Sequence, residues 1–312
     1  MGQRMLASVV RALVAVVAVA AVLAAPAPAF AAAPPDAHAV RLHRPAKVGD
    51  KFAYSADATV VQTMTVNNSG QIKTLQTRSI AVHFEGTEHV LAVNARGEPT
   101  RAEYVVAECT SREGKQNLTV IQPGRLVTVE AGKWQSRIDV DQGAFTIQDE
   151  LVARSVLSLA STDHPGDDEC FGTDKPSKPG ESWPVRADGL VRAYAAAPGL
   201  KVKKQNVSGT IKLAGLETVD GTACMKVQGK TKIEHFFPPA TDLPEHSRLQ
   251  DATMEYKFTK LLPLDPAGQC LMDSHSTNLQ LKLRVDDASI GSDIPVEGKL
   301  LRTVGIRRKP LK

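Results

Sequence analysis

The sequence feature that most constrains the fold is a short motif that occurs twice. Residues 47–52 read Lys-Val-Gly-Asp-Lys-Phe, and residues 178–183, which lie 131 positions later, read Lys-Pro-Gly-Glu-Ser-Trp. In each copy glycine permits a bend and the aromatic residue anchors the start of a strand in a core. A spaced repeat indicates a chain built from related units, so the sequence predicts two similar halves. The anchors of this repeat are Gly49, Phe52, Gly180 and Trp183.

Most of the chain after residue 50 alternates apolar and polar residues, which is typical of strands with one buried face. The pattern begins at Phe52 and Tyr54 and is clearest in the second half, at 207–213, 225–233 and 279–285. Antiparallel sheets with one solvated face produce this pattern. We therefore expect a mainly β protein made of two similar antiparallel halves, either half-barrel or sandwich-like.

One segment departs from the strand pattern. Between residues 148 and 160 the apolar residues fall at helical spacing, and acidic residues stand where a first helical turn favours them. The sequence predicts a connecting helix near 148–160 that lies across the first sheet. The expected organisation is a flexible leader at 32–46, a first β half with helix and linker at 47–177, a second β half at 178–306 and a frayed tail at 307–312.

The N-terminal residues 1–31 have the features of a signal peptide. Arg4 and Arg11 precede an apolar run, and an Ala-Phe-Ala sequence at 29–31 fits the small-x-small cleavage pattern. A retained membrane anchor is the alternative, but Pro26 and Pro28 end the run early, and no other segment is long enough to span. The sequence predicts export to the periplasm or the cell surface, with no membrane span after cleavage.

Four cysteines remain after the leader: Cys109, Cys170, Cys224 and Cys270. An even count in an exported chain favours two disulfides, because oxidising compartments let them persist. Spacing alone leaves three pairings open, and the repeat favours Cys109–Cys170 and Cys224–Cys270. No cysteine has the close spacing of a zinc site, so a tetrahedral metal centre is disfavoured.

The net charge is unevenly divided between the halves. Residues 32–177 carry 15 Lys and Arg against 19 Asp and Glu, a net charge of −4. Residues 178–312 carry 21 against 15, a net charge of +6. Opposite charges favour halves that attract each other, or a basic face for an acidic partner. Nucleic acid is disfavoured as a partner for an exported protein, and solvated β faces of different charge are an equal alternative.

Motifs for several chemistries are absent from the sequence. The eight histidines are scattered, and the serines on either side of His275 point to the opposite face of a strand from it. There is no nucleophile elbow or phosphate-binding glycine loop. Asp163, Asp167, Asp168 and Glu169 could supply oxygen ligands to calcium, but they match no calcium loop, so a hydrated acidic loop is the simpler interpretation. The sequence predicts no catalytic, cofactor-binding or metal-ligating residue and no cofactor.

Two resemblances rest on these features. The run at 179–183, Pro-Gly-Glu-Ser-Trp, resembles the "pGdsW" start found in secreted bacterial β proteins of unknown function. The layout is also similar in outline to half-barrel envelope proteins of the lipoprotein-carrier type, which cradle a lipid. The first resemblance implies an exported β protein. The second implies only an architecture and assigns a role to no residue.

The leading functional hypothesis is a non-catalytic module that binds an apolar or amphipathic ligand, or an envelope component. A surface interaction domain with no small ligand is the alternative, and a hydrolase comes third. A pocket between sheet and helix would favour the ligand hypothesis. Aromatic residues make up only 4% of the chain, which disfavours carbohydrate stacking. A basic surface for acidic envelope polymers is expected from lysines 201, 203, 204, 226, 230 and 232.

Overall fold

The computed structural model describes residues 36–68, 71–133, 135–142, 145–161, 164–195, 200–237, 247–287 and 291–311. The proposed signal peptide at 1–31 lies outside the described residues. The first half contains β1 (Lys51–Asn68), β2 (Gln71–Val93), β3 (Pro99–Glu113), β4 (Gln116–Thr119), β5 (Leu126–Glu130), β6 (Arg137–Val140), α2 (Ile147–Ala153) and α3 (Asp167–Phe171). The second contains β7 (Ser182–Pro184), α4 (Ala187–Ala195), η2 (Lys204–Asn206), β8 (Val207–Val219), β9 (Thr222–Glu234), β10 (Ser247–Pro263), β11 (Met272–Asp287) and β12 (Gly291–Pro310).

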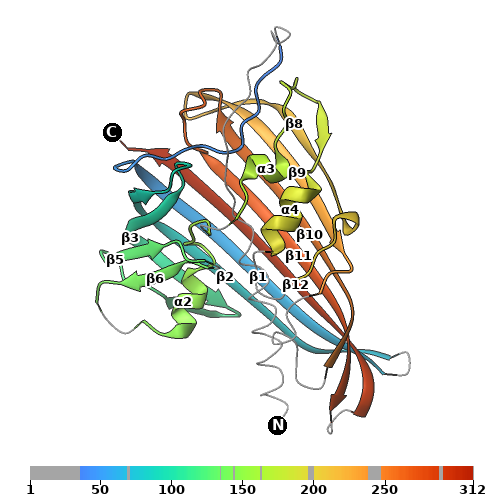
Figure 1. Ribbon diagram of the computed structural model, residues 1–312. Helices are drawn as coiled ribbons and strands as arrows, with labels where there is room; N and C mark the ends of the chain where they lie inside the picture. Colours follow the sequence, from blue (N-terminus) through green and yellow to red (C-terminus); the bar gives the residue numbers. More distant parts are fainter. Residues whose placement is uncertain are drawn as a thin grey trace.

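All twelve of these strands belong to one open antiparallel sheet (Figure 1). Its order is β6-β5-β3-β2-β1-β12-β11-β10-β9-β8-β7, with β4 paired to β3. The prediction of a mainly β, antiparallel protein is confirmed. Apart from β4, strands that follow one another in the chain are neighbours within each half, and the halves meet where β1 pairs with β12.

The contact between β1 and β12 makes the two halves one continuous sheet. Their register runs from Phe52 opposite Pro310 to Val66 opposite Val296. The predicted frayed tail at 307–312 is therefore wrong for its first four residues, which belong to β12. Arg308 within it donates to the Glu88 carboxylate at 2.6 Å, so the tail is fixed to β2 as well as to β1.

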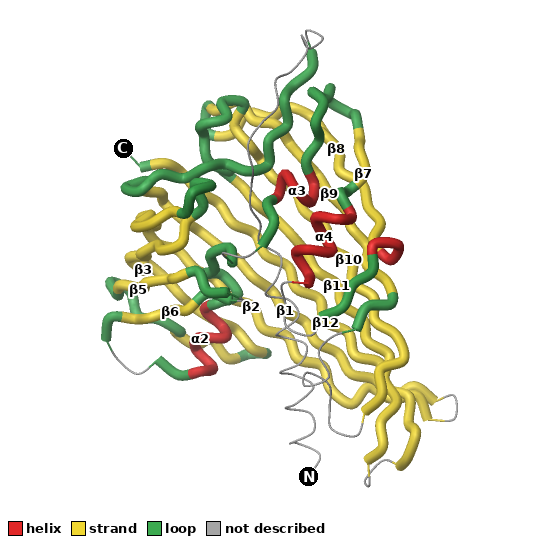
Figure 2. The backbone as a smooth tube through the Cα atoms, viewed as in Figure 1, coloured by secondary structure: helices red, strands yellow, loops and turns green. Residues whose placement is uncertain are grey.

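One face of the sheet is covered by the helices and the other is not. Figures 1 and 2 show α2, α3 and α4 on the same face, which we call the covered face. Two apolar clusters fill the space beneath them. The larger contains Phe171, Leu190 and residues of β8 to β12, and the smaller contains Leu157 and residues of β1, β2, β3, β5 and β6. Side chains alternate along each strand, so the residues between these core positions point to the opposite, outer face.

The segment at 36–46 is not the flexible leader that the sequence predicted. Leu42 is only 3% exposed and packs with Val40 in the larger cluster. Its backbone N–H donates to the Asp168 carboxylate at 2.7 Å, and His38 forms a β-bridge with Ser177. The Ala- and Pro-rich composition suggested a solvated chain, but apolar residues at alternate positions give the segment a side to bury.

The predicted helix is real but much shorter. Helix α2 begins at Ile147, where Thr146 and Asp149 form a capping box, and it ends at Ala153. Beyond it the chain is irregular, although Val156 and Leu157 are buried. The sequence does not predict helices α3 and α4, because α3 lies in the expected linker and α4 lies at the start of the expected second β half.

The two copies of the repeat motif form the same turn. Gly49 and Gly180 have φ angles of 95° and 94°, which glycine adopts without strain. Each glycine N–H donates to a carbonyl of the strand that pairs with the one after the turn: Val90 on β2 in one copy and Leu213 on β8 in the other. The aromatic anchors differ more: Phe52 is buried, whereas Trp183 is partly buried and its indole donates to the Phe171 carbonyl at 2.7 Å. Structural duplication beyond this turn stays a prediction, since β1 is a central strand and β7 a three-residue edge.

The predicted disulfides are not formed in this structure, where all four cysteines are free. Cys109 lies in the smaller cluster and Cys170 in the larger one, so the first expected pair is split between two parts of the core. Cys224 and Cys270 direct their thiols to the Thr222 and Met272 carbonyls. Burial raises the pKa of Cys109 and of Cys270 to about 12, so both are held as neutral thiols.

Candidate functional site

A hollow of about 740 Å³ opens at one end of the central strands, and we call it the strand-end groove. Its floor comes from four adjacent strands, β3, β2, β1 and β12, and one side comes from β10, β11 and the turn between β8 and β9. The lining residues are 53–55, 85–87, 105–107, 219–220, 261, 271–272 and 307–309. The volume is in the range of pockets that take small organic ligands.

The groove is hollow because its floor carries small side chains. Ala53 faces Thr87 on one side and Lys309 on the other. Ser55 stands in the next row on the same face of β1, and Ala107 lines the groove from β3. Directly opposed residues on neighbouring strands share a face of the sheet. A row of alanine, serine and threonine therefore leaves space that larger residues would fill.

Apolar side chains border this floor. Val105, opposite Thr87, is 48% exposed on one side. On the other side Val219, Leu261, Leu271 and Met272 belong to a small apolar cluster with Cys224. The cluster brings together the β8–β9 turn and the ends of β10 and β11. The result is a partly apolar hollow on the outer face, with aliphatic walls.

Beneath the floor, the covered face is rigidly packed. The rings of Tyr54, Phe84 and Tyr104 meet edge to face, with centroids 5.3 to 5.9 Å apart. Such aromatic contacts add stability beyond their buried area. The Tyr54 hydroxyl donates to the Val156 carbonyl at 2.7 Å, and burial raises the pKa of this tyrosine. The floor is thus fixed from behind and needs no ligand to form.

The charged residues of the groove fall into two groups. Arg308 points to the covered face, where it pairs with Glu88 and lies over the Tyr54 ring. Arg307 and Lys309 point to the outer face and are exposed. Neither has an ion pair or a side-chain hydrogen bond with any residue in the described part of the chain. The groove therefore combines aliphatic walls with two cations that are free to contact a ligand.

A second, smaller pocket of about 170 Å³ lies on the covered face beneath the 36–46 segment. It contains a buried ionic cluster in which Lys260 binds Asp167 at 2.6 Å and Asp273 at 3.1 Å. Burial lowers the pKa of Lys260, but the two carboxylates outweigh it, and the net pKa is well above the ordinary value. The cluster joins α3 to β10 and β11 through Lys260, which pairs with both carboxylates.

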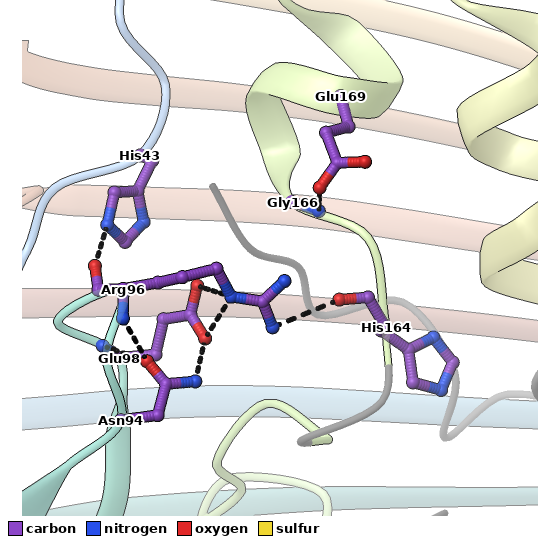
Figure 3. Close-up of polar contacts among 7 residues, drawn as sticks. All are labelled: His43, Asn94, Arg96, Glu98, His164, Gly166 and Glu169. Atoms are coloured by element: carbon purple, nitrogen blue, oxygen red, sulfur yellow. Dashed lines mark hydrogen bonds and ion pairs between the residues drawn. The ribbon is translucent and has the colours of Figure 1, made fainter. Parts of the chain in front are cut away.

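The segments that cross the covered face before β1 and before α3 also contact the loop between β2 and β3 (Figure 3). The Arg96 guanidinium pairs with Glu98 and donates to the His164 carbonyl at 3.3 Å. His43 contacts the Arg96 carbonyl at 2.7 Å, so this histidine fixes the 36–46 segment to the loop. Asn94 donates to Glu98 within the same loop. These contacts fix the pieces of chain that cross the covered face.

The acidic residues considered for calcium are bound to protein groups instead. Asp167 pairs with Lys260, and Asp168 accepts the Leu42 N–H. Glu169 accepts the Gly166 N–H at 3.1 Å, as Figure 3 shows, and pairs with Arg192 at 2.6 Å. Asp163 lies outside the described residues. Within the described ranges no group of His, Cys, Asp or Glu is placed to hold a metal ion.

The expected basic surface is largely neutralised. Lys226 pairs with Glu217 at 2.6 Å, and Lys230 pairs with Glu255 at 2.8 Å. Lys204 and Lys232 have acidic partners as well. The sequence showed the lysines alternating along strands, but it did not show which acidic residues the neighbouring strands bring beside them.

The groove is not where the sequence placed a ligand pocket. The space between sheet and helices is occupied by fully buried side chains, among them Leu157, Ile211 and Phe236. Sequence reasoning missed the outer-face groove because its residues come from strands whose order was unknown. The signal that could have found it is the small residues at 53 and 55 on the side of β1 away from the core.

Comparison with known proteins gives no family. No protein-family model and no curated protein matches the chain. A structure of lipid–protein interactions in lipovitellin is similar over 85% of this chain and 26% of that chain, with 11% identity and a TM-score of 0.32. A DUF1329 family protein from Desulfovibrio piger matches 80% of this chain and 85% of that chain, with 9% identity and a TM-score of 0.12.

The chain spans about a quarter of the lipovitellin chain that it resembles. At such TM-scores the likenesses carry no argument about function. A functional assignment therefore rests on the geometry of the groove itself.

Among the residues described, no helix has the length and apolar character needed to cross a membrane.

Proposed function

We propose that this is an exported, non-catalytic protein that binds an apolar or amphipathic small molecule in the strand-end groove. The observation that carries the proposal is the hollow of about 740 Å³ itself, with a floor of small residues and walls of valine, leucine and methionine. Binding sites for small molecules are concave, mostly apolar and largely formed in advance. The signal-peptide pattern at residues 1–31 supports export.

Two other ligand classes fit the groove less well. A sugar would need an exposed aromatic platform, but the single aromatic residue in the lining, Tyr54, has its ring packed on the covered face. A peptide added as a strand would need an unpaired sheet edge. The floor strands β2, β1 and β12 each have a partner on both sides, so they offer none. A ligand that binds through apolar contact is the class that remains.

Saturable binding of an apolar fluorescent probe to the folded protein tests this proposal. Thr87→Phe places a ring over the groove floor, whereas Thr59→Phe places the same ring on the same face of the sheet outside the lining. We expect Thr87→Phe to weaken probe binding by about tenfold or more, which is about 1.4 kcal/mol. Thr59→Phe should bind as the unaltered protein does.

Two results would contradict the proposal. One is the absence of saturable binding to the folded, unaltered protein. The other is equal binding by the Thr87→Phe and Thr59→Phe variants, which would place the probe elsewhere. In either case the interaction-domain alternative would take the place of ligand binding.

A further inference from the structure

We propose that the ligand of the strand-end groove is a single-chain amphiphile with one anionic headgroup, such as a long-chain carboxylate, and that Arg307 and Lys309 hold this headgroup. The inference rests on the proposed function, because it names the class of ligand for the same groove. It adds a charge requirement that an apolar pocket alone does not impose.

The two cations are adjacent on the groove floor. Arg307 and Lys309 are two residues apart on β12, so they project from the same face about 7 Å apart. Their neighbours on β1 are Ser55 and Ala53, which are short and uncharged. No acidic side chain of β1 therefore stands directly opposite either cation, and a headgroup above Ser55 and Ala53 would contact both.

The acidic residues of the groove lining, Glu85 and Asp220, form no ion pair with Arg307 or Lys309 among the described residues. Glu85 lies 3.6 Å from the ring of His83, which also contacts Asp57 at 2.8 Å. Asp220 lies at the opposite side, on the β8–β9 turn. Two adjacent cations that no carboxylate binds suit one anionic group.

The position of the cations beside aliphatic walls favours an amphiphile over a free anion. Arg307 stands directly opposite Met272 on β11, and Met272 is opposite Leu261 on β10. Both belong to the apolar cluster that borders the groove. A small anion would leave these walls in contact with water, whereas an aliphatic chain attached to the anion would cover them.

The test compares two ligands of the same chain length, decanoate and 1-decanol, by competition against the bound apolar probe at pH 8. The double variant Arg307→Gln, Lys309→Gln removes both cations. Lys299→Gln is the matched control, because Lys299 lies on the same strand and the same face but outside the groove. We expect decanoate to bind about tenfold more tightly than 1-decanol to the unaltered protein and to Lys299→Gln. The double variant should bind both ligands equally.

The outcomes separate this inference from the proposed function. Equal binding of decanoate and 1-decanol by the unaltered protein would overturn the charge requirement and leave the apolar groove intact. A preference for decanoate that persists in the double variant would also overturn the assignment to Arg307 and Lys309. If the probe itself does not bind saturably and neither ligand binds, the proposed function is wrong. Acetate, which has the charge without the aliphatic chain, should not displace the probe.

Discussion

Asp273 lies between Lys260 and His275 on the covered face of the sheet. Its carboxylate lies 3.1 Å from Lys260 and 3.6 Å from His275. Burial raises the pKa of Asp273, but the neighbouring Lys260 and His275 outweigh it, and the net pKa is well below the ordinary value. A depressed pKa in the folded state means that the charged carboxylate stabilises the fold at neutral pH.

We predict that Asp273→Asn destabilises the protein by about 3 kcal/mol at pH 7, the lower end of the cost of breaking a buried ion pair, because Asp167 still contacts Lys260. The contribution of Asp273 is present above its unfolded pKa of about 3.9 and is lost as the pH falls through its lower folded pKa. The variant should therefore lose less stability than the unaltered protein between pH 4 and pH 2.

Urea unfolding at a series of pH values measures this difference. Asp57→Asn, which removes an exposed carboxylate on the outer face, is the control and should leave stability at pH 7 within about 0.5 kcal/mol. Parallel stability curves for Asp273→Asn and the unaltered protein would show that the carboxylate does not stabilise the fold.

At the repeat motif, local rules describe single residues. Gly49 and Gly180 lie at positive φ, which glycine adopts without strain, and Phe52 is buried, whereas Trp183 is only partly buried. Local rules could not predict that the two cations of the groove, Arg307 and Lys309, lie on an internal strand. Arg307 was assigned to a frayed tail, since its place on an internal strand depends on pairing with β1, 252 positions away in the case of Ser55.

Among the elements, the segment at 36–46 closes one side of the core, where Val40 and Leu42 are buried. We predict that Leu42→Ala destabilises the protein by about 2–5 kcal/mol, the usual cost of deleting a buried leucine side chain. Val48→Ala is the control, because Val48 is 63% exposed and its loss should cost less than about 0.5 kcal/mol.

Thermal or denaturant unfolding of the two variants decides this prediction. Equal midpoints would mean that residues 36–46 do not contribute to the core, as their composition suggested. A lower midpoint for Leu42→Ala alone would show that the segment is part of the folded domain.

Strands were predicted well because period-two alternation survives in any sheet, whatever its neighbours. Helices were predicted poorly because their extent here depends on tertiary contacts. The chain after Ala153 keeps apolar residues at helical spacing, but Ser136 donates to the Leu159 carbonyl and accepts its N–H, which holds that stretch in an irregular path. The helical spacing of the apolar residues therefore predicted correctly that Val156 and Leu157 are buried, but it predicted a helical backbone where the chain is irregular.

Across the whole molecule, the sheet has no internal boundary. The long register between β1 and β12 means that each half supplies a central strand to the other. A half on its own would expose this strand as a long unpaired edge, and such edges promote aggregation. The sequence could not show this, because a repeat of motifs is equally compatible with two separate domains.

We predict that fragments 32–177 and 178–312, produced separately, fail to give soluble, cooperatively unfolding protein, and that mixing or co-expressing them restores a 1:1 complex. The physical reason is that β1 and β12 each lose one of their two neighbours when the chain is divided between α3 and β7. Size-exclusion chromatography and circular dichroism of each fragment and of the pair measure the outcome. If 178–312 alone unfolds with the midpoint of the whole chain, the halves are independent domains and the β1–β12 ladder adds nothing to their stability.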